Sequence, residues 1–140
     1  MSSELNQLLK PLRDKIDALD HQILDLLNQR AQTAIEVGQV KHSFDADDAV
    51  IKPEREAQVI RALQKDNLNG KFPNTSVASV WTEIISACRG LERGLMIAYL
   101  GPKGSFSEQA AYEFYGHAVQ VLPCPSFDEV FRAVESGQAD

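Results

Sequence analysis

The sequence predicts an all-α domain of three helices, followed by an incomplete α/β segment. In the first part, apolar residues recur at alternating steps of four and three residues from Leu5 to Phe44, which is the pattern of a coiled-coil helix. In the last part, two short apolar runs alternate with helix signals, which indicates β-α-β-α order. We therefore expect a helical domain at residues 1–95 and a second unit at residues 96–140.

The first helix is expected to be unusually long. No proline follows Pro11 before residue 53, so nothing interrupts the apolar seam. A helix over residues 3–42 would be roughly 60 Å long at ~1.5 Å per residue, about twice the width of a small domain. Such a helix cannot bury its seam within its own short chain. A partner chain is the simplest solution, and a homodimer is predicted.

Helix breakers divide the rest of the helical domain. The stretch SFDADDAVIKPE breaks the pattern and reads as a loop, and its Pro53 suits the first turn of a second helix. The stretch DNLNGKFPN is a second loop. A third helix then carries apolar residues at helical spacing and is expected to end near Gly94.

Residues 96–140 contain two predicted strands, MIAYL and AVQVL. Each is followed by a possible capping box at the start of a helix, first Ser105 with Glu108 and then Ser126 with Glu129. Two short strands are marginal on their own. We therefore expect this unit to be the beginning of a second domain that the chain does not contain in full.

Composition excludes several classes of function. The chain is 44% hydrophobic and 24% charged, which is a globular balance. Its net charge of -6, without a run of Lys or Arg, argues against a nucleic-acid partner. No secretory signal and no apolar run of membrane-spanning length is present. Cys88 and Cys124 lack metal-type spacing, so we expect reduced thiols, no metal site and a cytoplasmic protein.

Charged residues interrupt the apolar face of each helix in the helical domain. Arg30 falls on the seam of the first helix, and Lys41 falls beside it eleven residues later. Glu56, with Arg55 next to it, shares the apolar face of the second helix, and Glu92 follows Cys88 by four residues. Any one of these is readily explained as a side chain that reaches solvent at the helix edge or end.

Inward charges on three helices together are harder to explain in that way. A buried, unpaired charge costs several kcal/mol, so such charges should converge on one another or on a ligand. The predicted pocket is rich in cations and fits a small ligand with more than one carboxylate. Arg13 lies seventeen residues before Arg30, ~25 Å along the same helix. It either is a solvated surface charge or reaches the pocket of an antiparallel partner chain.

Four stretches of the first part resemble the all-helical class of chorismate mutases: LRDKIDALDHQILDLLNQR, EVGQVK, PEREAQVI and EIISACRGLE. The stretch IAYLGPKGSFSEQAA is similar to the opening of prephenate dehydratase. In this order, the two resemble the bifunctional P-proteins of bacterial phenylalanine biosynthesis. The resemblance implies a dimer interlocked through the long first helices, with two composite active sites, no cofactor and no metal.

The resemblance also implies roles for individual residues. Arg13, donated by the other subunit, and Arg30 would hold the two carboxylates of chorismate. Lys41 would contact a carboxylate and the breaking ether oxygen. Lys52 would offer mainly a backbone contact, and Glu56 would take the ring hydroxyl.

Three further positions would lie in or beside the pocket. They are Arg55, Cys88 and Glu92, of which Glu92 would donate a hydrogen bond to the ether oxygen. Some members of the family carry Gln at this position, which donates at any pH, whereas a Glu must be protonated to donate. Some also carry Ser where this chain has Cys88, so a hydrogen bond there would be weaker.

The implied reaction is the pericyclic rearrangement of chorismate to prephenate, which needs no nucleophile. Prephenate dehydratase activity is expected to be absent from these 140 residues. Two alternatives stay open at this point. One is an isochorismate pyruvate lyase, which shares the fold and much of the pocket. The other is a non-catalytic helical dimerisation module, for which Arg30 and Lys41 would not matter.

Overall fold

The computed structural model describes residues 2–44 and 51–140. Helix α1 covers Ser3–Ser43, 41 residues, and the predicted long helix is confirmed. The Ser2 hydroxyl begins it by accepting a hydrogen bond from the backbone N–H of Leu5. Pro11 lies within the helix. The expected loop after α1 lies largely at residues 45–50, outside the described part of the chain.

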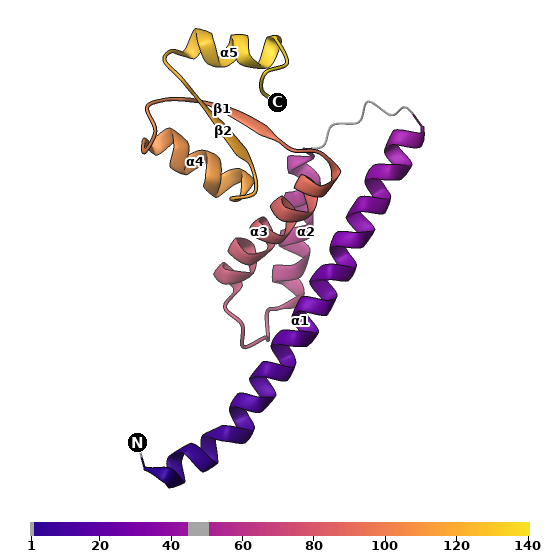
Figure 1. The fold of residues 1–140 in the computed structure, drawn as a ribbon, viewed down its shortest axis with the longest axis vertical. Coiled ribbons are helices and arrows are strands. Elements are labelled where there is room, and N and C mark those ends of the chain that lie inside the picture. Colours follow the sequence, from indigo (N-terminus) through magenta and orange to yellow (C-terminus); the bar gives the residue numbers. More distant parts are fainter. Residues whose placement is uncertain (1, 45–50) are drawn as a thin grey trace.

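Helices α2 (Pro53–Asp66) and α3 (Asn74–Glu92) complete the helical part. Pro53 occupies the first turn of α2, as predicted, and α3 ends two residues before Gly94. A reciprocal pair of hydrogen bonds joins α2 to α3, because the Gln64 and Asn74 side-chain amides each donate to the backbone carbonyl of the other residue. Helix α3 packs against both α1 and α2, so it is the centre of this part (Figure 1).

The remaining elements are β1 (Met96–Leu100), α4 (Phe106–Tyr115), β2 (Gln120–Cys124) and α5 (Phe127–Glu135). The two strands pair in parallel, with Met96 opposite Gln120 and Leu100 opposite Cys124. The predicted β-α-β-α order is therefore confirmed. The hydroxyls of Ser105 and Ser126 cap α4 and α5 by accepting from the N–H three residues later.

The predicted start of the second strand is wrong by two residues. The prediction places it at Ala118, whereas β2 begins at Gln120. Residues 117 and 118 instead direct their backbone N–H groups to Glu83 and Ser86 of α3. An N–H that donates to α3 is not available to a sheet ladder. The strand therefore begins at Gln120, after this contact.

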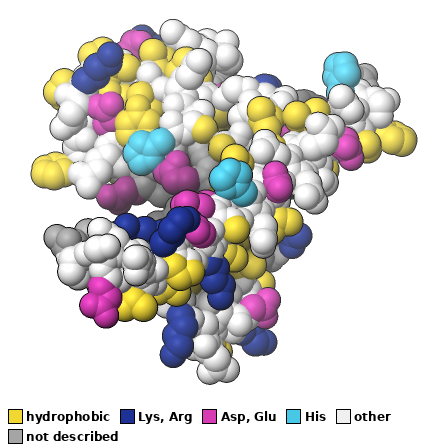
Figure 2. Space-filling model, turned by 60° about the horizontal axis from the view of Figure 1, so that its bottom comes forward, with side chains coloured by type: hydrophobic (Ala, Val, Ile, Leu, Met, Phe, Trp, Pro, Cys, Tyr) yellow, Lys and Arg dark blue, Asp and Glu magenta, His cyan; other side chains and the backbone are white. Residues whose placement is uncertain are grey.

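Helix α1 exposes its apolar seam. None of its described residues is buried, and its first half projects beyond the other elements (Figure 1). Ile16 and Leu19 are exposed by 57% and 45%. Hydrophobic side chains also appear in patches across the face drawn in Figure 2. An apolar surface of this extent marks an interaction site. None of the described helices has the length and apolar character needed to cross a membrane.

Candidate active site

A cavity of about 480 Å³ lies where α1, α2 and α3 meet. Ligand sites in proteins commonly have volumes of this order, roughly 300–1,000 Å³. Five cationic side chains and two carboxylates line it: Arg30, Lys41, Lys52, Arg55, Arg89, Glu56 and Glu92. The excess of positive over negative groups suits an anionic ligand.

One strip of α1 forms one wall of the cavity. Arg30, Val37 and Lys41 all line it, since steps of seven and four residues keep side chains on nearly the same face of a helix. Gly38, the neighbour of Val37, lies against the end of α3, where an added Cβ atom would be 3.4 Å from Cγ of Glu92, an ordinary van der Waals contact. The last turns of α1 and α3 therefore pack directly against each other.

An ion pair joins the α1 wall to α3. Lys41 Nζ donates to Glu92 Oε2 at 3.1 Å, and the two side chains are exposed by 27% and 17%. The pair therefore lies at the cavity wall, partly shielded from solvent. A ligand oxygen beside this pair would be close to both the Lys41 ammonium and the Glu92 carboxyl group.

A second ion pair, between Arg89 and Glu56, lines the cavity beside α2. Arg89 Nη1 donates to Glu56 Oε1 at 2.5 Å, and the Arg89 side chain is only 5% exposed. Sequence reasoning placed Glu56 here but missed Arg89. Arg89 follows Ile85 by four residues and precedes Glu92 by three, so helical spacing alone would have placed it on the inward face of α3.

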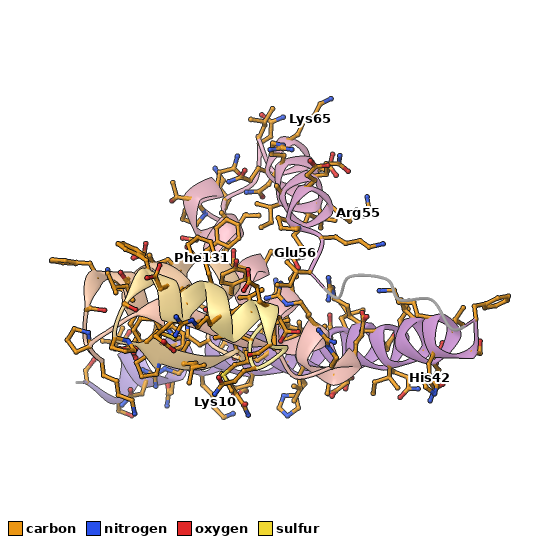
Figure 3. All side chains as sticks on the ribbon, turned by 90° about the horizontal axis from the view of Figure 1, so that it is seen from above. Lys10, His42, Arg55, Glu56, Lys65 and Phe131 are labelled. Carbon is orange, nitrogen blue, oxygen red and sulfur yellow. The ribbon has the colours of Figure 1, made fainter. Side chains whose placement is uncertain are left out.

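The remaining cations that line the cavity are Arg30, Lys52 and Arg55. Arg55 and Glu56 are neighbours at the beginning of α2 (Figure 3), and Lys52 is the N-cap residue of that helix. Among the described residues, neither Arg30 nor Arg55 forms an ion pair with a carboxylate. Their guanidinium groups are therefore available to bind a carboxylate in a bidentate fashion.

Apolar residues and one thiol complete the cavity. Cys88 is a free, buried cysteine, and it lines the cavity together with Val59 and Ile85. No group of three or more His, Cys, Asp or Glu side chains is arranged to hold a metal ion within the described ranges.

Arg13 is the one predicted site residue that does not line this cavity. It is exposed and lies on the projecting half of α1. A second, apolar cavity of about 620 Å³ runs along α1 beside α2 and α3, and Arg30 reaches it as well. Its wall is formed mainly by Ile23, Leu26, Leu27, Leu63, Val77, Val80, Trp81 and Ile84.

Comparison with known proteins places the two parts of the chain in two families. Residues 12–93 match the family described as chorismate mutase type II, and residues 97–140 match the prephenate dehydratase family. The chain belongs to the chorismate mutase type II family.

Three curated relatives bear the name bifunctional chorismate mutase/prephenate dehydratase. The protein of Neisseria gonorrhoeae is 46% identical over 140 residues, that of Aquifex aeolicus 42% over 135, and that of Escherichia coli 32% over an alignment of 154. These alignments include 100%, 94% and 100% of this chain, which spans 37%, 37% and 39% of the respective relatives. No solved structure matches the chain significantly.

Proposed function

We propose that the cavity between α1, α2 and α3 binds chorismate and accelerates its rearrangement to prephenate. One observation carries this proposal: in a member of the chorismate mutase type II family, four cations predicted from the sequence line a single cavity. They are Arg30, Lys41, Lys52 and Arg55. The relatives' names support the same activity.

The arginines orient the substrate. Chorismate carries two carboxylates, one on the ring and one on the flexible enolpyruvyl arm. Arg30 holds one of them, and Arg13 of a second subunit holds the other, each through a charge-assisted fork. Fixing both ends folds the arm over the ring, and such orientation supplies a large part of the rate enhancement of a unimolecular rearrangement.

Lys41 and Glu92 act on the bond that breaks. Negative charge develops on the ether oxygen as the C–O bond lengthens, and a cation or hydrogen-bond donor at that oxygen stabilises the transition state more than the ground state. The Lys41 ammonium is such a group, and protonated Glu92 is another. Glu56 accepts a hydrogen bond from the ring hydroxyl. Arg55, Cys88 and the backbone of Lys52 complete the substrate-binding wall.

The proposed assembly is a homodimer with two antiparallel α1 helices. In this arrangement the exposed seam of each α1 packs on the other chain, and the apolar cavity beside Leu26 and Trp81 receives the partner's side chains. The antiparallel direction carries Arg13 of one chain toward Arg30 of the other. The anionic site is then completed by two chains.

The decisive experiment measures the consumption of chorismate by the purified chain and identifies the product. Formation of prephenate is expected, with kcat/KM reduced by about 100-fold or more in Arg30→Ala, because the charge-assisted contact with a substrate carboxylate is lost. Arg61→Ala removes an exposed arginine of α2 and should behave as wild type. Release of pyruvate from isochorismate, without prephenate formation, would instead indicate a lyase. If neither compound is converted, the result would indicate a non-catalytic dimerisation module.

A further inference from the structure

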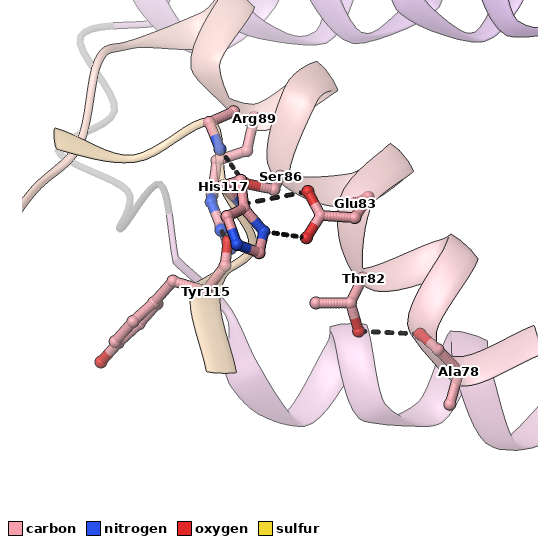
Figure 4. Close-up of polar contacts among 8 residues, drawn as sticks. Ala78, Thr82, Glu83, Ser86, Arg89, Tyr115 and His117 are labelled. Carbon is pink, nitrogen blue, oxygen red and sulfur yellow. Dashed lines mark hydrogen bonds and ion pairs between the residues drawn. The ribbon is translucent and has the colours of Figure 1, made fainter. Parts of the chain in front are cut away.

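One face of α3 holds the turn that follows α4. Its side chains Glu83, Ser86 and Arg89 are spaced by three residues and therefore lie in a row on the helix (Figure 4). Glu83 accepts hydrogen bonds from the backbone N–H of His117 at 3.0 Å and from its imidazole at 2.6 Å. Ser86 Oγ accepts from the N–H of Ala118 at 3.2 Å.

Arg89 makes the third contact of this row. Its Nη2 donates to the carbonyl oxygen of Tyr115 at 2.7 Å. Tyr115 is the last residue of α4, where a helix has carbonyl groups without intrahelical partners and a partial negative charge. The Arg89 guanidinium donates to one of these free carbonyl groups, and its positive charge is attracted to the partial negative charge of the helix end.

Close packing fixes the turn against α3. Gly116 has φ 77°, a conformation that favours glycine, and a Cβ atom there would lie 2.4 Å from Cβ of Ser86. Ser86 itself is 2% exposed. The position of the Tyr115 carbonyl relative to α3 is therefore strongly constrained.

The other arm of the same guanidinium enters the candidate active site. Nη1 of Arg89 holds Oε1 of Glu56, while Nη2 holds Tyr115. The guanidinium is planar and rigid, so fixing one nitrogen restricts the other. Residues 115–118 are thereby connected to Glu56 at the cavity wall through one buried side chain, that of Arg89.

We propose that Arg89 is a positioning residue for Glu56, held in place by the Tyr115 carbonyl, so that docking of the 115–118 turn on α3 sets the affinity of the mutase site for its substrate. This inference rests on the proposed function, in which Glu56 binds the ring hydroxyl of chorismate. Arg89 fixes one carboxylate oxygen and leaves the other for the substrate.

The test is a set of steady-state measurements on the full chain. The hydroxyl contact is made in the ground state and in the transition state alike, so its loss raises KM more than it lowers kcat. In Arg89→Met we expect KM for chorismate to rise about tenfold, with kcat within about threefold of wild type. Arg89→Lys retains a cation beside Glu56 and should recover part of the affinity.

A matched control removes another arginine from the end of the same helix. Arg93 is exposed, pairs with Asp140 and does not line the cavity. The variant Arg93→Met should therefore leave KM unchanged. A tenfold rise in KM in this variant as well would mean that any arginine lost from the end of α3 disturbs the site, and the specific role of Arg89 would be withdrawn.

Double variants separate positioning from general stability. If Arg89 acts through Glu56, then Arg89→Met has little further effect on KM in a Glu56→Gln background. Gly116→Ala, which displaces the turn, should raise KM in wild type but not in Arg89→Met. If circular dichroism shows that Arg89→Met does not fold, Arg89→Lys takes its place. Its effect on KM is then compared between the wild-type and Glu56→Gln backgrounds.

Two failures are distinguishable. If the wild-type chain converts no chorismate, the proposed function is wrong and the positioning role is withdrawn with it. If the wild-type chain is active, but the Arg89 variants change KM by the same factor with and without Glu56→Gln, only the positioning role is wrong.

Discussion

Lys41 and Glu92 are 51 residues apart in the sequence, yet Nζ of the one lies 3.1 Å from Oε2 of the other at the wall of the cavity. In this contact Glu92 is the acceptor. The donor role toward the ether oxygen requires a proton on the Glu92 carboxyl group, because an ionised carboxylate only accepts hydrogen bonds.

The first prediction follows from this requirement. Glu92→Gln supplies a permanent donor of similar shape, so its kcat/KM for chorismate should equal or exceed that of the wild-type chain. Glu92→Ala removes the donor and should lower kcat/KM by about 100-fold. A Gln variant as impaired as the Ala variant would show that Glu92 does not donate to the ether oxygen.

The second prediction concerns the assembly. The chain should sediment as a dimer at micromolar concentration, because the α1 seam is exposed in a single chain. Ile16→Asp places a charge on the seam and should yield monomers or weaken the dimer strongly. His21→Asp introduces the same charge on the opposite face of α1 and should remain dimeric. A monomeric wild-type chain with its helical content intact would contradict the proposed dimer.

The third prediction tests the shared site. Arg13→Ala and Arg30→Ala should each be nearly inactive alone. Mixed and allowed to exchange subunits, they should recover on the order of a quarter of wild-type activity, because half of the dimers are mixed and each mixed dimer has one intact site. The measurement is chorismate turnover after subunit exchange, verified by a size-tagged chain. Proven exchange without recovery would rule out donation of Arg13 across the interface.

The fourth prediction concerns pH and the turn on α3. The hydrogen bond from the His117 side chain lowers the pKa of Glu83 from its ordinary value. A carboxyl group with a lowered pKa in the folded state stabilises the fold above its unfolded pKa, and this contribution is lost as pH falls through the folded pKa. Between about pH 6 and 3, the melting temperature of wild type should therefore fall more than that of Glu83→Gln.

The expected difference in melting temperature is a few degrees at most, because both side chains are largely exposed and such contacts contribute little. Glu113→Gln, on the exposed face of α4, is the matched control and should follow wild type. Equal acid sensitivity in wild type and Glu83→Gln would show that the contact with His117 does not contribute to stability.

Local sequence patterns determined most of the elements. The four-three repeat predicted α1 to within a residue at its end, and Pro53, Ser105 and Ser126 each mark the beginning of a helix because their effects act within one turn of the backbone. The same periodicity placed Arg30 and Lys41 on one strip. These features depend on residues close in the chain, so the sequence by itself was sufficient for them.

Only the tertiary structure decided what depends on residues far apart in the chain. The start of β2 moved to Gln120 because Glu83 and Ser86 capture the preceding backbone N–H groups. Sequence reasoning missed Arg89, because its importance follows from partners 33 residues before it and 26 residues after it. Periodicity assigns a side chain to a face of its own helix. Which groups meet that face is set by the packing of the other elements, and in this chain that packing brings Glu56 and Tyr115 to one guanidinium.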